Sequence, residues 1–175
     1  MVKKFGNDLT FDGAKTIIAG QRGLLLSIKN IVNQQKEIER IVGHGWGEVI
    51  YEAERKAIKE AVPQIVGVKE LDMLLKNSKI SKKAIIQNLI GLFNQTGLGL
   101  LKLSEFNEKN SYFIVTVENS PIPEEYEKRD APVCFHLAGI FAGAAEAIFM
   151  MPMICKEVKC VSMGHQYCEF KIMKR

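Results

Sequence analysis

Apolar and polar positions recur with helical spacing through much of the first half of the chain. Residues 14–31 mix short apolar runs with glycines, which predicts one or two short strands leading into a helix. Helical patterns follow at about 33–43 and 46–62, and we expect Pro63 to end the second helix. The glycine-rich segment 43–47 between them predicts a break or a tight helix–helix contact.

The middle of the chain changes from helical to strand-like patterning. A short helix is predicted at 71–76, and a longer one at about 81–95 with Ser81 as its N-cap. Apolar and polar residues then alternate in two segments, 98–106 and 112–118, separated by a polar turn. This arrangement predicts an antiparallel β-hairpin.

The last third of the chain is the most apolar. Residues 119–130 contain two prolines and many charges and predict a surface loop. Residues 131–150 are apolar nearly all round a helix, which predicts a long buried helix near the C-terminus. Two strands are expected at 153–162 and 167–173. The sum is an α+β fold in which antiparallel β-hairpins pack with several helices.

Composition narrows the class of protein. The chain has 175 residues, of which 47% are hydrophobic and 25% charged, so we expect one soluble domain over 1–175. The net charge of +4 is spread along the sequence, which does not favour a nucleic-acid partner. The most apolar stretch contains Glu146 and Pro152, which speaks against a membrane span. No secretory signal is visible at the start, so we expect a cytoplasmic protein.

The four cysteines, Cys134, Cys155, Cys160 and Cys168, all lie in the C-terminal quarter of the chain. Structural disulfides are rare in the cytoplasm, so thiols gathered in this way favour a metal site or a reactive site. Two alternatives remain open, namely four buried thiols without chemistry and a disulfide.

Spacing alone does not choose the metal ligands. Cys160 and Cys168 flank the predicted turn 163–165, where two hairpin arms can bring their thiols together. Glu157 and Cys160 are three residues apart, so a flat strand points them to opposite faces unless a bulge intervenes or the strand ends. Cys155 competes with Glu157 because both lie on one face. Further candidates by chemistry are His136 and His165.

A resemblance to a known family decides what spacing leaves open. The pattern Cys134-x-His136-x-x-Gly139-x-x-x-Gly143, followed by Glu157-x-x-Cys160-x-x-x-Gly164-x-x-x-Cys168-x-Phe170-x-Ile172, resembles the 4-vinyl reductase domain family. This family includes sensor domains of phenol-responsive transcription activators and is related in fold to TRAPP trafficking subunits. The resemblance implies a structural zinc ion whose ligands are Cys134, Glu157, Cys160 and Cys168, and it leaves Cys155 as a buried thiol.

The resemblance also implies a pocket for a small apolar or aromatic molecule, or for an acyl chain. The alanines and glycines between 138 and 145 make the buried helix slim, which is typical of close helix packing or of a cavity beside it. Each candidate lining residue can equally be a core residue, and the histidine a hydrogen-bonded core histidine. The candidates are His136, Phe141, Phe149, Trp46, Tyr51 and Phe113.

An enzymatic function finds little support in the motifs. No glycine-rich dinucleotide-binding unit, P-loop or Ser–His–Asp order stands out, so we lean against catalysis. We expect a zinc-stabilised module that binds or senses a hydrophobic ligand and, like its relatives, forms a homodimer. One alternative is a protein–protein scaffold of the TRAPP type with a filled pocket, and a second is a tetrapyrrole vinyl reductase or its accessory. Glu146, in the apolar helix, is expected to pair with a basic group or to lie at a subunit interface.

Overall fold

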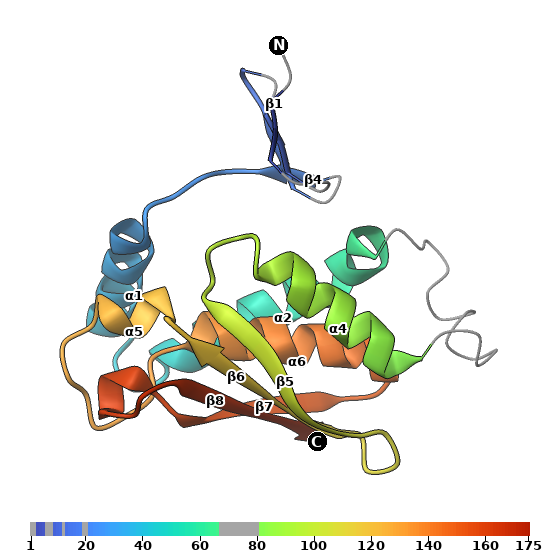
Figure 1. Ribbon diagram of the computed structural model, residues 1–175. Coiled ribbons are helices and arrows are strands. Elements are labelled where there is room, and N and C mark those ends of the chain that lie inside the picture. The colour runs from blue at the N-terminus through green and yellow to red at the C-terminus, as the bar shows by residue number, and fades with distance from the viewer. Residues whose placement is uncertain (1–2, 6–8, 12, 19–20, 67–80) are drawn as a thin grey trace.

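Two antiparallel sheets and a group of helices form the fold (Figure 1). The computed structural model describes residues 3–5, 9–11, 13–18, 21–66 and 81–175. The predicted helix at 71–76 lies outside these residues. The predicted α+β class, with antiparallel hairpins packed against helices, is confirmed. Within the described ranges, no helix has both the length and the apolar character needed to cross a membrane.

A small N-terminal sheet consists of four strands of three residues each, in the order β1-β2-β3-β4. Its members are β1 (Lys3–Phe5), β2 (Leu9–Phe11), β3 (Thr16–Ile18) and β4 (Gln21–Gly23). The last two are the short strands predicted within 14–31. The first two were not predicted, because three residues are too few to display a period of two.

The larger sheet comes from the second half of the chain and has the order β5-β6-β8-β7. Its strands are β5 (Leu100–Asn107), β6 (Tyr112–Glu118), β7 (Met153–Lys159) and β8 (Cys168–Lys174). In β6 and β8 every second residue is buried, and the buried residues face each other in the register Phe113↔Ile172, Val115↔Phe170 and Val117↔Cys168. One face of this sheet is covered by helices, while β5 and β7 form its edges (Figure 1).

The described helices are α1 (Ile28–Val42), α2 (Trp46–Ile65), α4 (Lys82–Phe93), α5 (Pro121–Glu124) and α6 (Phe135–Phe149). Helix α6 is buried on nearly all sides, since twelve of its residues are classed as buried, and it packs along α2 (Figure 1). The break predicted at 43–47 separates α1 from α2. It is also a tight contact, because a Cβ on Gly47 would lie 2.4 Å from the ring of Phe135.

Several predicted helix limits are corrected by the structure. Helix α1 begins earlier than expected because Ser27 caps it, its hydroxyl oxygen accepting the N–H of Asn30 at 3.2 Å. Helix α2 does not end at Pro63, since this proline lies in the last turn and removes only one backbone hydrogen bond there. Helix α6 begins after Cys134 rather than at residue 131, because the Cys134 N–H is held by the Glu157 carboxylate instead.

The predicted surface loop at 119–130 is wrong in part. Ser120 precedes the short helix α5, and Ile122, Pro123 and Tyr126 are buried against the rest of the fold. The charged residues of this segment are compatible with burial of its apolar members, because a single turn of helix points the two kinds of side chain in different directions.

Helices α2 and α6 approach each other closely through two glycines. A Cβ on Gly139 would lie 2.5 Å from the carbonyl oxygen of Tyr51, and one on Gly143 would be closer still to that of Arg55. Of the two predicted meanings of the slim helix, close packing is therefore the one found at these positions.

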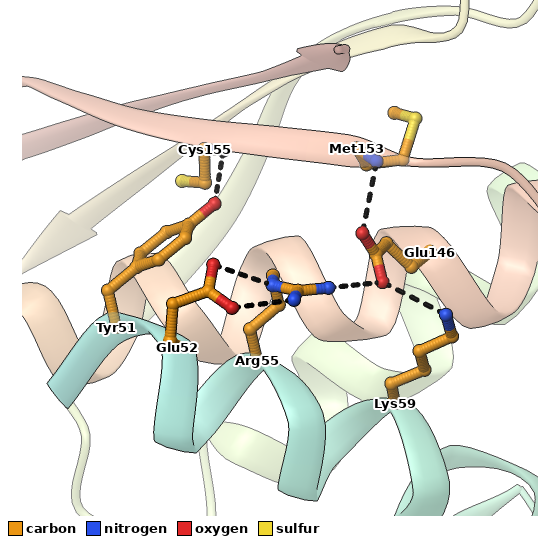
Figure 2. Close-up of polar contacts among 7 residues, drawn as sticks. All are labelled: Tyr51, Glu52, Arg55, Lys59, Glu146, Met153 and Cys155. Carbon is orange, nitrogen blue, oxygen red and sulfur yellow. Dashed lines mark hydrogen bonds and ion pairs between the residues drawn. The ribbon is translucent and has the colours of Figure 1, made fainter. Parts of the chain in front are cut away.

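A buried ion pair reinforces this contact (Figure 2). Glu146 of α6 is 6% exposed and lies 2.7 Å from Arg55 and 3.2 Å from Lys59, both on α2. Arg55 also pairs with Glu52, at 2.6 Å. The prediction that Glu146 pairs with a basic group is confirmed, and removal of one partner would leave a buried charge uncompensated.

Side chains of both helices also cover the outer edge of β7 (Figure 2). Glu146 accepts the N–H of Met153 at 3.3 Å, and the hydroxyl oxygen of Tyr51 accepts the N–H of Cys155 at 3.1 Å. An edge strand otherwise leaves such amides open to solvent or to another chain. These two bonds fix the position of α2 relative to β7, which matters for the pocket described below.

We expect Gly143→Ala to lower the free energy of unfolding by about 2 kcal/mol, because the added methyl group collides with the backbone of α2. The matched control is Gly91→Ala in α4, where nothing lies within 4 Å of the added carbon. There the better helix propensity of alanine should raise stability by about 0.5–1 kcal/mol. Urea denaturation of both variants checks this, and a shift of the same sign in both would contradict the packing account.

Candidate functional site

Three cysteines and one glutamate converge where α6 begins. Their ligand atoms, on Cys134, Glu157, Cys160 and Cys168, all lie within 4.8 Å of one another. Cys134 is the N-cap of α6, Glu157 belongs to β7, Cys160 follows β7 and precedes a short 3₁₀ turn (Val161–Met163), and Cys168 opens β8. Segments far apart in the sequence therefore meet at one point.

The end of β7 explains how Glu157 and Cys160 reach the same point. The register of β7 against β8 shifts between Glu157 and Lys159, and the strand ends before Cys160. Both conditions that the sequence spacing called for are thus present. Cys155, His136 and His165 do not join the cluster of ligand atoms.

Distances between the sulfur atoms suit a tetrahedral ion. The Cys134 sulfur lies 3.9 Å from that of Cys160 and 3.8 Å from that of Cys168. A tetrahedron with metal–sulfur bonds of about 2.3 Å has edges of about 3.8 Å, which matches. All three residues are 0% exposed and all are free thiols, so the separations are those of neither a disulfide nor an open surface site.

The carboxylate of Glu157 supplies the fourth corner. Its Oε2 accepts the backbone N–H of Cys134 at 3.0 Å, which fixes the side chain. Its Oε1 is buried without a hydrogen-bond partner among the described residues. A buried carboxylate oxygen left in this way is costly, and a cation between it and the sulfurs would satisfy it.

Without a cation the cluster is electrostatically strained. Burial, followed by repulsion from the Cys160 sulfur, raises the pKa of Glu157 from 4.5 to about 8. Hydrogen bonds from the Cys134 and Cys168 thiols lower the pKa of Cys160, and the bond to Cys160 raises the pKa of Cys134. The group therefore holds protons that a divalent metal would displace.

A pocket with a volume of about 460 Å³ opens beside the cluster, between α2, the first turn of α6 and β7. Cys134 and Glu157 form part of its lining, and Glu48 and Lys156 stand at exposed positions on it. Its apolar wall includes Phe135, Ala138 and Ile154, and the hydroxyl-bearing ring of Tyr51 completes it.

The six pocket residues predicted from the sequence do not gather in one place. Tyr51 lines the pocket beside the cluster. Phe113 and Phe141 line a cavity of about 20 Å³ between α4, β6 and α6, which has room for about one water molecule. Phe149 stacks on Phe113 with ring centres 6.2 Å apart.

The two remaining candidates lie near α2. Trp46 packs edge-on against Phe135, with ring centres 4.8 Å apart, so it stands behind a residue of the pocket wall. His136 Nδ1 lies 2.8 Å from a carboxylate oxygen of Glu54, a hydrogen-bonded partner that suits a structural histidine. Sequence reasoning missed Phe135, Ala138 and Ile154. Their proximity to the ligands Cys134 and Glu157 along the chain is the signal that could have found them.

The Glu157 carboxyl makes the stability of the metal-free protein depend on pH. Its pKa is about 8 when folded and 4.5 ordinarily, so the folded state holds the proton more tightly than the unfolded state. The resulting stabilisation is complete below the lower pKa and is lost as the pH rises through the higher one. We expect the melting temperature of chelator-treated protein to fall between pH 4.5 and 8, and Glu157→Gln to flatten that fall.

Thermal melts across this range check the expectation, with metal-loaded protein as the comparison. Metal binding requires deprotonated ligands, so the loaded protein should instead gain stability as the pH rises. A melting temperature of the metal-free protein that rises toward pH 8 would contradict the assignment of Glu157 as a buried, unpaired carboxyl.

Comparison with known proteins places this site in a family pattern. The family model of the vinyl-4-reductase domain matches residues 113–174, a range that holds all four cluster residues. The resemblance to the 4-vinyl reductase family is confirmed over this segment. The uncharacterized protein MJ0745 of Methanocaldococcus jannaschii is 32% identical over 80 residues. That match covers 46% of this chain and 41% of the relative, so it spans less than half of either protein.

Two solved structures share the fold at low identity. The phenol-responsive sensory domain of the transcription activator PoxR, solved with phenol, superposes with a TM-score of 0.75 at 17% identity, covering 95% of this chain and 84% of that one. A trafficking protein particle complex subunit 3 from Naegleria fowleri, covalently bound to palmitic acid, gives 0.57 at 11% identity, covering 85% and 95%. At these identities the likeness establishes the fold.

Proposed function

We propose that this protein is a zinc-stabilised module that binds a small apolar or aromatic molecule and carries out no catalysis itself. The observation that carries the proposal is the position of the pocket. A mostly apolar pocket of about 460 Å³ is lined in part by Cys134 and Glu157, members of the buried cluster, so the metal site and the ligand site share residues. Its volume falls within the range of small-molecule sites.

Zinc is the ion that this ligand set favours. Three thiolates and a carboxylate are soft and borderline ligands, and a tetrahedral site without an open position is structural rather than catalytic. Held there, the ion would tie the start of α6 to β7 and β8. The bound site keeps two excess negative charges, which suits a role in the fold better than Lewis-acid chemistry on a substrate.

The shared fold supports the choice of ligand class. PoxR's sensory domain was solved with phenol, and the TRAPP subunit with palmitic acid, so this fold holds aromatic and aliphatic molecules in those proteins. Here the pocket walls are carbon-rich, with Phe135 available for stacking. No other domain lies within the described residues, so a signal would pass to a separate partner.

Assembly with a protein partner is a second candidate, and exposed apolar side chains favour it. Leu24 and Leu25 are 76% and 72% exposed in the segment before α1, and Ile41 at the end of α1 is 72% exposed. Exposed apolar groups of this size commonly mark interaction surfaces. A homodimer is the simplest such assembly, and it is compatible with ligand binding.

Zinc content tests the metal half of the proposal. We expect about one zinc per chain, lost in Cys168→Ala together with several degrees of melting temperature, because the site and the fold are coupled. Cys155→Ala is the matched control, since it removes an equally buried thiol that lies outside the cluster. It should keep its zinc, and zinc loss in this control would mean that the ligand set is wrong.

Ligand binding is tested by native mass spectrometry of gently purified protein and by titration with small aromatic probes. We expect a co-purifying apolar compound or measurable binding of a probe, weakened at least about tenfold in Ala138→Leu, whose larger side chain fills the pocket. Protein that stays free of ligand and binds no probe, while behaving as a stable assembly, would favour the scaffold.

A further inference from the structure

The hydroxyl group of Tyr51 stands in the wall of the pocket with a defined hydrogen-bonding state. The side chain reaches from α2 to the outer edge of β7, where its oxygen meets the backbone of Cys155 (Figure 2). The Cys155 N–H donates to this oxygen at 3.1 Å. Tyr51 also lines the pocket, so the same hydroxyl borders both the strand edge and the ligand space.

The bond to Cys155 leaves the hydroxyl's own hydrogen free to donate. A tyrosine hydroxyl has one donor hydrogen and two acceptor lone pairs, and an amide N–H occupies only a lone pair. Among the contacts of the described residues, no acceptor receives a hydrogen bond from Tyr51. Burial raises the pKa of this phenol above 10.0, so the hydrogen stays in place at neutral pH. The pocket therefore presents a fixed donor.

Charge around the pocket disfavours an anionic ligand. Glu48 and Glu157 line it against a single cation, Lys156, which is exposed. A metal-loaded cluster adds two excess negative charges at the same wall. A carboxylate would meet this negative field while losing its hydration, which is costly. A neutral acceptor escapes that cost.

We propose that the pocket selects neutral aromatic molecules bearing a hydrogen-bond acceptor, such as an aryl ketone or aldehyde, whose oxygen accepts the hydrogen of Tyr51. This inference rests on the proposed function and names the chemical class of its ligand. The aromatic ring lies against Phe135, Ala138 and Ile154. A hydrocarbon of the same shape leaves the hydroxyl without a partner when it displaces water, and this separates the two classes.

Titration of the zinc-loaded full chain with three probes tests the inference. The probes are acetophenone, toluene and benzoate, which share a ring and differ in the acceptor and the charge. The fluorescence of Trp46, the only tryptophan of the sequence, can report binding because its ring packs on Phe135. We expect acetophenone to bind about tenfold more tightly than toluene, and benzoate to bind more weakly than acetophenone.

Two tyrosine variants show whether the hydroxyl is responsible. Tyr51→Phe keeps the ring and should bring acetophenone to the affinity of toluene, while toluene binding stays unchanged. The unchanged toluene affinity shows that the pocket survives even if loss of the bond to Cys155 lowers the melting temperature. Tyr126→Phe is the matched control, since its hydroxyl donates to Gln35 at 3.2 Å and does not line the pocket. It should alter neither affinity.

The outcomes separate this inference from the function on which it rests. Equal affinities for toluene and acetophenone in the unaltered protein, or an equal loss of both in Tyr51→Phe, would overturn the acceptor selection and leave a hydrocarbon-binding module. Tight binding of benzoate would overturn the charge argument. If none of the three probes binds, the proposed function fails, and the inference fails with it.

Discussion

The meeting of three buried sulfurs and one carboxylate at the start of α6 is the constraint on which the rest of the structure depends. Cys134 fixes the first residue before the helix, and its N–H is held by Glu157 from β7. Cys160 and Cys168 bring both ends of the terminal hairpin to the same point. Burial of such groups without a cation leaves an unpartnered carboxylate oxygen and a proton-poor sulfur. A bound metal removes both costs at once, which is why we centre the account on it.

The pocket follows from the same arrangement. Gly139 and Gly143 let α2 lie against the backbone of α6, and Tyr51 and Glu146 attach these helices to the edge of β7. The space that remains beside the first turn of α6 is closed on one side by the cluster residues themselves. Any change in the geometry of the cluster is thereby felt in the pocket wall. This adjacency gives a physical route by which ligand binding and metal binding would be linked.

Much of the fold was predictable because the larger elements carry strong periodic signals. The hairpin of β5 and β6, the helix after Ser81 and the break between α1 and α2 were all read from the sequence. The limits of α1, α2 and α6 were not, because they depend on the Ser27 cap, on Pro63 falling in a last turn, and on the hold of Glu157 on Cys134. Strands of three residues, such as β1, show too little pattern to be predicted.

The site divides in the same way. The four cluster residues were predicted because a motif resemblance assigned them, whereas spacing alone left Cys155 and both histidines open. The structure supplies the reason for the choice in the register shift after Glu157, which no residue type announces. The pocket could not be predicted from aromatic content, since most predicted aromatic residues proved to pack elsewhere, and its wall depends on which small residues meet across α2, α6 and β7.

X-ray absorption at the zinc edge, on protein purified without added metal, is the most direct test of this account. Three sulfur scatterers at about 2.3 Å and one oxygen at about 2.0 Å would match the predicted site. A spectrum without zinc, or one dominated by nitrogen and oxygen ligands, would contradict it.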